Sequence, residues 1–301
     1  MKRATSQGKR QSMKIFPGEE NQCVWMKAGV VNYKLCENAY DCLTCPFDKA
    51  MSRAAERKPE KAISWRDVMK SKEYHQRECR HMLTGRVHYR FCSNGYRCDI
   101  CEFDQALDEN DLAASPAAAH LKNVAGFHVA DGYHYHRGHS WARVEHGGFV
   151  RIGIDDFALK LLGHPTDVKL PKLGAHVEQT NVGWTIHRDN RKADVLAPIN
   201  GVVLATNHKA VKQPDTMKKD PYGEGWLMVI EPRNLKKNLK NLLFDQEAAL
   251  WTQNEAQRLE SIVMAAYGRP LAATGGEVVD DIFGNLPDMK WEDLVHEFLL
   301  T

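Results

Sequence analysis

The sequence predicts a mainly β domain in the second half of the chain, with a duplicated cysteine-rich region before it and helices after it. Residues 131–232 contain short β-branched and aromatic runs separated by turn residues, a pattern typical of a compact β domain. A block with four cysteines recurs after 56 residues, so that the two copies hold all eight, and leucines at helical spacing follow residue 234. These three observations divide the chain into its parts.

Composition allows more than one folded part and gives no sign of a membrane span. The chain has 301 residues, 43% of them hydrophobic, and its formal net charge is +2, so charge alone indicates no particular partner. No apolar run approaches the roughly 20 residues that a spanning helix needs, and the N-terminus has no apolar signal segment. We therefore expect a cytoplasmic protein, in which cysteines serve metal or redox chemistry and not disulfides.

Three segments are predicted to lie outside the compact parts. Residues 1–22 are polar and basic and are expected to form a disordered, solvated tail. Residues 51–78 are rich in Ala, Arg, Lys and Glu, which predicts a charged helical linker. Residues 108–130 include a run of small residues around Pro116, so we expect the main linker of the chain there.

The cysteine-rich region is an internal duplication. Residues 23–50 and 79–106 align without a gap, and each copy has the spacing Cys-x12-Cys-x5-Cys-x2-Cys. We therefore predict two four-cysteine modules, at 23–50 and 79–107. The candidate metal ligands are Cys23, Cys36, Cys42 and Cys45 in the first module, and Cys79, Cys92, Cys98 and Cys101 in the second.

Metal binding explains this pattern better than packing alone. A Cys-x2-Cys pair can turn two sulfurs toward one ion, and two further thiolates complete a tetrahedron. Each module is too short to bury a self-sufficient core, so a metal would supply the missing stability. Structural zinc at two sites is the first interpretation, iron–sulfur clusters are the second, and free or redox-active thiols are the third. The spacing leaves both the metal and the connectivity of the ligands between the modules open.

Turn residues predict the order of the elements within the β domain. Two strands flank His146-Gly-Gly148 and form a hairpin. Asp155 or Asp156 then caps a short helix that ends at Gly163. A last strand covers residues 226–231.

A second hairpin is the most distinctive feature of this domain. The run from Val182 to Val203 has two apolar stretches that flank a polar, charged tip around Asn190. A further turn is predicted at Asn200-Gly201, because both residue types tolerate positive φ. What the tip carries is therefore the first functional question.

Five separated motifs connect this domain to a known family. They are Asp131-Gly-Tyr-His-Tyr-His-Arg-Gly-His139-Ser-Trp141, the run 152–163, Leu170-Pro-Lys-Leu-Gly174, Ala197-Pro-Ile-Asn-Gly201 and Asp220-Pro-Tyr-Gly-Glu-Gly-Trp226. In this order they resemble the glycine cleavage system H protein family. The resemblance implies that residues 131–250 form a mainly β flattened barrel or sandwich, related to biotin and lipoyl carrier domains, with C-terminal helices.

The chain departs from this family at the hairpin tip. The resemblance implies a lysine there that carries lipoic acid, and the alignment of the motifs on both sides places Asn190 at that position. An Asn carboxamide has no nucleophilic amine to form the lipoyl amide, so a lipoyl cofactor is not expected. Lys192 is an alternative acceptor, two residues farther along and on the same strand face. The charged tip is either a solvated turn or a surface repurposed for docking.

Residues 251–301 are expected to form a helical tail that ends in an amphipathic helix. The apolar stripe of this last helix consists of Trp291, Leu294, Val295, Phe298 and Leu299. Such a stripe either packs on the protein's own surface or inserts into a groove of a partner.

These features favour a protein without catalytic activity of its own. No nucleophile triad, phosphate loop or nucleotide fingerprint is present. The leading hypothesis is an H-protein-like adaptor with two metal modules, which docks in a multiprotein or redox assembly through the hairpin tip or the C-terminal helix. The alternatives are an iron–sulfur electron-transfer or redox-sensing protein and a lipoyl carrier of a glycine cleavage-type system. No membrane partner is expected, and no nucleic acid either, because neither module has the pattern of a recognition helix. The pathway, the partners and the oligomeric state stay open.

Overall fold

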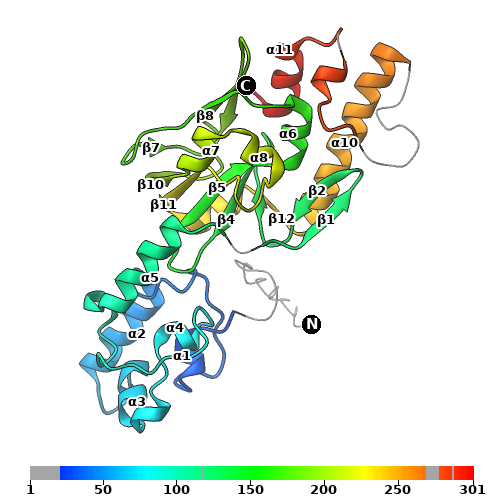
Figure 1. Ribbon diagram of the computed structural model, residues 1–301. Coiled ribbons are helices and arrows are strands. Elements are labelled where there is room, and N and C mark those ends of the chain that lie inside the picture. The colour runs from blue at the N-terminus through cyan, green and yellow to red at the C-terminus, as the bar shows by residue number, and fades with distance from the viewer. Residues whose placement is uncertain (1–20, 117, 269–277, 287) are drawn as a thin grey trace, which may run out of the picture. The chain divides into compact units, whose positions relative to one another are not determined.

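The chain forms two compact units in its computed structural model (Figure 1). The N-terminal unit ends at Asp99 and the C-terminal unit starts at Ile100, whereas the sequence predicted the main linker farther along the chain. Nearly all of the predicted disordered tail and part of the C-terminal helical tail lie outside the described residues. The structure describes residues 21–116, 118–268, 278–286 and 288–301.

The N-terminal unit consists of short helices, and its two copies of the repeat share one local fold. In each copy an isolated β-bridge joins the residue before the first cysteine to the residue before the second, Gln22 to Leu35 and Glu78 to Phe91. A one-turn helix follows the first cysteine of each copy. The helical elements are α1 (Val24–Lys27), α2 (Pro46–Arg57), α3 (Trp65–Ser71), η1 (Tyr74–Gln76), α4 (Arg80–Leu83) and, across the end of the unit, η2 (Cys98–Ile100).

One carboxylate organises the core of the N-terminal unit. Asp48 is only 6% exposed and accepts the indole N–H groups of Trp25, at 2.8 Å, and Trp65, at 3.0 Å. The ring of Trp65 also packs edge-on against Tyr96, with 5.4 Å between the ring centroids. Because Trp65 lies between the two copies in sequence and contacts both, the predicted helical linker contributes to a core that the copies share.

Antiparallel sheets form the centre of the C-terminal unit (Figure 1). The main sheet has seven strands in the order β12-β3-β4-β5-β11-β10-β7, a second has the order β6-β8-β9, and β1 pairs with β2. These sheets are open, so the domain is a sandwich and not a closed barrel. The strands are β1 (Leu121–Val124), β2 (Phe127–Ala130), β3 (His134–Tyr135), β4 (Ser140–Val144), β5 (Val150–Ile154), β6 (Asp167–Lys169), β7 (His176–Val177), β8 (Val182–Arg188), β9 (Arg191–Leu196), β10 (Gly201–Thr206), β11 (Met228–Pro232) and β12 (Leu243–Phe244).

Helices complete the C-terminal unit, and the predicted C-terminal helices are present. The last predicted helix is a single α-helical turn that continues as a π-helical turn. None of the helices in the described ranges combines the length and the apolar character that crossing a membrane requires. The helical elements are α5 (Glu102–Ala113), α6 (Asp156–Leu162), α7 (His208–Lys212), α8 (Asp215–Lys219), α9 (Leu235–Leu239), α10 (Gln246–Tyr267), η3 (Phe283–Asn285), α11 (Trp291–Leu294) and η4 (Val295–Leu299).

Local sequence signals predicted several of these elements correctly. Strands β4 and β5 form the expected hairpin around His146-Gly-Gly148. Asp155 caps α6, since its carboxylate accepts the backbone N–H of Ala158 at 2.9 Å. Gly163 ends the same helix with a φ of 79°, a value that favours glycine.

The predicted turn at Asn200-Gly201 was wrong. Strands β9 and β10 belong to different sheets, so the chain passes from one sheet to the other at this point and does not form a hairpin. Gly201 is required for another reason, because a Cβ atom there would collide with the backbone of Glu231 on the neighbouring strand. The Asn-Gly pair thus marks a close approach of two strands.

The second half of the predicted 108–130 linker is also structured. Strands β1 and β2 form a hairpin in register from Leu121 with Ala130 to Val124 with Phe127. Phe127 and Val129 are buried, and Phe127 packs against Phe157 of α6 with ring centroids 4.6 Å apart. This hairpin therefore belongs to the C-terminal unit.

Candidate functional site

The tip of the β8–β9 hairpin lies where the sequence predicted it. Arg188 pairs with Arg191, which leaves Asp189 and Asn190 as a two-residue turn. Asp189 has a φ of 51°, in the left-handed region that Asp tolerates better than most residues. Asn190 is exposed at the outermost point of the hairpin and presents a carboxamide there.

Lys192, the alternative acceptor, lies within strand β9 and not in the turn. It pairs with His187 on β8, and its side chain is 69% exposed. Its ammonium Nζ is 3.2 Å from Oδ2 of Asp194, which forms an ion pair on the strand surface. Hydrogen bonds from Thr185 and Lys192 lower the pKa of Asp194, so this carboxylate remains charged at neutral pH.

The C-terminal segment from Asp281 onward contacts this hairpin, and no local pattern in the sequence predicted the contact. Arg188 donates to both carboxylate oxygens of Asp281, at 2.6 and 2.8 Å, and also to the carbonyl of Leu162 at 2.7 Å. Burial opposes ionisation of Asp281, but the hydrogen bonds from Arg188 and from the Gly284 backbone hold its pKa below the usual value. The hairpin is thus tied to a segment 93 residues away in sequence.

An aromatic pair extends this contact to the other strand. The guanidinium groups of Arg188 and Arg191 lie over the ring of Phe283, at 5.3 and 5.1 Å from its centroid. Phe283 packs edge-on against Trp291, whose indole N–H donates to the carbonyl of Lys192 at 2.7 Å. The C-terminal segment therefore holds both sides of the tip.

The last residues of the chain continue along strand β9. Phe298 and Leu299 are fully buried, and the hydroxyl of Thr301 donates to the carbonyl of Asp194 at 2.9 Å. All five residues of the predicted apolar stripe are buried, so this face is used within the protein. Of the two predicted partner surfaces, the exposed hairpin tip is the one that remains accessible. We call the segment Asp281–Thr301, without residue 287, the hairpin brace.

A buried histidine connects the brace to the core. His139 is completely buried, with its Nδ1 2.8 Å from Oδ2 of Asp155 and its Nε2 3.9 Å from Oε2 of Glu255. Its ring stacks on Phe157 and also contacts Phe298 of the brace. Burial alone would lower the pKa of His139, but the two carboxylates outweigh this effect and raise it to about 9. The sequence showed this histidine only as part of a family motif.

The cysteine modules show a common sulfur environment. In the first copy the backbone N–H of Tyr40 donates to Sγ of Cys36 at 3.2 Å, and in the second Tyr96 donates to Cys92 at 3.3 Å. Both tyrosines have a left-handed φ, 60° and 59°, which turns the amide toward the sulfur. Backbone amides aimed at sulfur stabilise negative charge on it, as a bound thiolate would require.

The thiols themselves are not arranged as a closed metal site. Burial raises the pKa of the Cys23 thiol to about 11, and smaller effects of Cys36 and Cys45 act in the same direction. Burial also raises the pKa of Cys42 strongly, with a smaller effect from Cys36. Within the part of the chain that the structure describes, no group of three or more His, Cys, Asp or Glu residues is placed to hold a metal.

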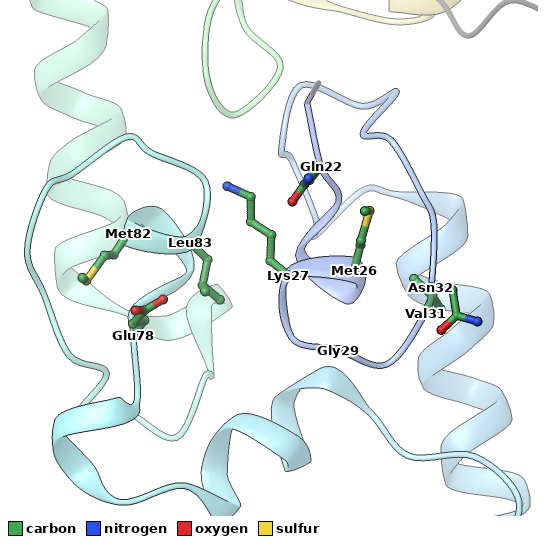
Figure 2. A pocket seen from close by; sticks show the side chains of 9 residues that line it. All are labelled: Gln22, Met26, Lys27, Gly29, Val31, Asn32, Glu78, Met82 and Leu83. Carbon is green, nitrogen blue, oxygen red and sulfur yellow. The ribbon is translucent and has the colours of Figure 1, made fainter. Parts of the chain in front are cut away.

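A polar cleft of about 620 Å³ lies between the two copies (Figure 2). Lys27 of the first copy extends into it, while Glu78 belongs to the opposite wall. Equivalent residues line both sides, since Gln22 corresponds to Glu78 and Met26 to Met82 in the repeat. The remaining lining residues are Gly29, Val31, Asn32 and Leu83.

Comparison with known proteins identifies relatives of the C-terminal unit. Residues 133–255 match the family described as Glycine cleavage H-protein. The probable glycine cleavage system H protein of Pyrococcus horikoshii is 35% identical over 120 residues, which are 40% of this chain and 89% of that protein. The glycine cleavage system H protein of Xanthomonas campestris pv. campestris strain B100 is 36% identical over 40% of this chain and 91% of its own length.

A solved structure is also similar to part of the chain. The crystal structure of a glycine cleavage system H protein from Mycobacterium marinum is 31% identical, with a TM-score of 0.33, and the match covers 35% of this chain and 87% of that one. The family match at 133–255 includes neither the cysteine modules nor the hairpin brace. These two parts are therefore additions to the matched domain.

Proposed function

Because this chain belongs to the glycine cleavage H-protein family, we propose that its C-terminal unit is a docking adaptor in a protein assembly and does not carry a lipoyl arm. The observation that carries this proposal is Asn190 at the tip of the β8–β9 hairpin, where the family has its lipoyl-lysine. An amide cannot attack an activated lipoyl group, so the tip can be recognised by partners without being modified.

The hairpin brace supports the same conclusion. A carrier domain has to present its tip to a ligase, whereas here both strands of the hairpin are held, by Asp281, Phe283 and Trp291. A tip fixed in this way loses little conformational entropy when it docks. The exposed surface left for a partner consists of Asp189, Asn190, Arg191 and Lys192.

The experiment is intact-mass analysis of the full chain after incubation with a lipoate ligase, ATP and lipoate. The native chain is expected to keep its mass, while Asn190→Lys is expected to gain one lipoyl group, because the ε-amine is restored at the tip. Lys192→Arg is the matched control, since it keeps the charge and removes the only nearby amine within the strand. A lipoyl group on the native chain that disappears in the control would establish a carrier instead.

The carrier alternative has one observation in its favour. The side chain of Lys192 is 69% exposed and lies two residues from the turn. Its ion pair with Asp194 is on the surface, where such pairs contribute about 0–1 kcal/mol, so the pair would not prevent acylation. The mass experiment separates this alternative from the adaptor.

We also propose two metal modules formed by the eight cysteines, of which all but Cys101 belong to the N-terminal unit, with structural zinc as the first candidate. The support is the repeated spacing and the repeated N–H···S hydrogen bonds from Tyr40 to Cys36 and from Tyr96 to Cys92. The first module would use Cys23, Cys36, Cys42 and Cys45, and the second would use Cys79, Cys92, Cys98 and Cys101. Zinc would add stability to these short helices, whose apolar core is one small cluster around Trp25 and Trp65.

Iron–sulfur clusters are the second candidate, and they would make the protein an electron-transfer or redox-sensing component. The same four-cysteine spacing suits them, and amide hydrogen bonds to sulfur are one of the ways in which proteins tune cluster potentials. Metal and labile-sulfide analysis of an anaerobic preparation separates the two. Two zinc ions per chain and no sulfide support the structural modules, whereas iron with sulfide supports the redox component.

A further inference from the structure

The charge of this protein is divided unevenly between its two units. Residues 21–99 contain 15 Lys and Arg against 9 Asp and Glu, a net charge of +6, whereas residues 100–301 contain 21 against 28, a net charge of −7. The nearly neutral total hides this difference, which is counted with neutral thiols; each four-thiolate zinc site would add a charge of −2. A basic unit attached to an acidic one is typical of recognition of a polyanion by the basic part.

Exposed aromatic side chains are concentrated in the same basic unit. Tyr33 is 64% exposed, Tyr74 59% and Tyr89 75%, and no aromatic side chain in the described part of the C-terminal unit is comparably exposed. Tyr33 and Tyr89 occupy the same position in the two copies of the repeat. An exposed ring contributes little to folding, so its presence in both copies points to a binding role.

Two of these exposed rings, Tyr74 and Tyr89, form one cluster with Phe91. Phe91 packs edge-on against Tyr89, with centroids 4.9 Å apart, and against Tyr74, at 6.0 Å. Phe91 is also bridged to Glu78, which lines the cleft between the copies. On the other side of the cleft, Asn32 is a lining residue and directly precedes Tyr33. The aromatic cluster, the polar cleft and Tyr33 thus all belong to the N-terminal unit.

Two of the three exposed tyrosines are followed by a cationic side chain. Tyr33 precedes Lys34 and Tyr89 precedes Arg90, whereas Tyr74 lies between Glu73 and His75. Lys27 extends into the cleft itself (Figure 2). An apolar protein partner would be matched by aliphatic residues around the rings, whereas alternating rings and cations match bases and phosphates.

We propose that the N-terminal unit binds single-stranded nucleic acid, with unpaired bases stacking on Tyr89, Tyr74 and Tyr33 and phosphates attracted by the basic side chains between them. The sequence did not predict nucleic-acid binding, because neither module has the pattern of a recognition helix. Stacking on exposed rings requires no such helix, but it does require bases that are free of a duplex.

The test is fluorescence anisotropy of the full chain, as purified with its metal content measured, with a labelled 20-nucleotide oligothymidylate and a labelled oligouridylate. Saturable binding is expected at about 50 mM salt, with an affinity that falls as salt rises. A duplex of the same length is expected to bind about tenfold more weakly, because its bases are not available for stacking.

Substitutions distinguish stacking from attraction by charge alone. Tyr89→Ala is expected to weaken binding about tenfold, and the double variant Tyr33→Ala, Tyr89→Ala is expected to weaken it further. The affinity of Tyr89→Phe should stay within about twofold of the native chain, because this variant keeps the ring. Leu173→Ala, at an exposed site in the C-terminal unit, is the matched control and should have no effect. Circular dichroism checks that every variant is folded.

Two results would contradict the proposal. Absence of saturable binding to either oligonucleotide overturns the proposal, and so does binding that Tyr89→Ala leaves unchanged. Polyglutamate of matched charge, used as a competitor, is expected to be about tenfold poorer than unlabelled oligonucleotide. Equal competition would mean that the surface recognises acidic proteins instead.

Discussion

The substitution Phe298→Ala tests whether the hairpin brace is an integral part of the C-terminal unit. Phe298 is fully buried, and its ring centroid is 5.3 Å from that of Phe157. The guanidinium carbon of Arg258 lies over the same ring, 5.3 Å from its centroid. Removing a buried Phe side chain costs about 1.5–3 kcal/mol of transfer free energy, and the lost ring contact costs about 0.5–1.5 kcal/mol more. With the cavity that remains, we expect the free energy of unfolding to fall by about 3–5 kcal/mol.

The assay is urea denaturation of the full chain, followed by far-ultraviolet circular dichroism and by tryptophan fluorescence. Because the chain has two units, the transition of the C-terminal unit has to be resolved from that of the N-terminal unit before a free energy is assigned. Leu250→Ala, at an exposed site on α10, is the control and should change stability by less than about 0.5 kcal/mol. A loss below about 1 kcal/mol for Phe298→Ala would refute the reasoning, since it would mean that the brace is not packed in solution.

Three further predictions concern charged groups. The pKa of His139 is raised to about 9, so its ion pair with Asp155 stabilises the folded protein fully below about pH 6.5. This stabilisation is lost as the pH rises toward about 9. The urea concentration at the unfolding midpoint should therefore fall more over this pH range for the native chain than for His139→Gln. Asp281→Asn removes the carboxylate that accepts two hydrogen bonds from Arg188 and should lower the free energy of unfolding by about 1–3 kcal/mol. Proteolysis of the C-terminal segment should become faster. An unchanged rate of cleavage would contradict the contact. Asp48→Asn weakens the acceptor of two buried indoles and should lower the melting temperature of the N-terminal unit, measured by tryptophan emission, while that of the C-terminal unit stays constant.

Local sequence signals were sufficient for the β4–β5 and β8–β9 hairpins and for the two ends of α6. The cap at Asp155, the glycine at position 163 and the tip at Asn190 depend on residues within a few positions of one another, so their spacing could be recognised directly. The family motifs then supplied the arrangement of these elements. Asn200-Gly201 shows the limit of local signals, because the glycine is needed by a strand that lies about 30 residues away.

The parts that the sequence did not predict depend on long-range contacts. The pair of Arg188 and Asp281 joins residues 93 positions apart, and each of them alone is an ordinary surface residue type. The aromatic cluster was missed for a similar reason, because Tyr74 and Phe91 become neighbours only when the helices of the N-terminal unit pack. The cysteine repeat was evident in the sequence, but its spacing does not fix where the sulfurs point.

The position of Trp65 has a consequence for how the N-terminal unit can be divided. Its indole donates to Asp48 of the first copy while its ring packs on Tyr96 of the second, and the side chain is inaccessible to water. A fragment that ends after the first copy would lack this indole and leave Asp48 without one of its donors. A fragment that begins with the second copy would expose the face of Tyr96. The smallest fragment expected to fold by itself therefore spans both copies. We expect the two copies to unfold as one cooperative unit, although the sequence contains two repeats.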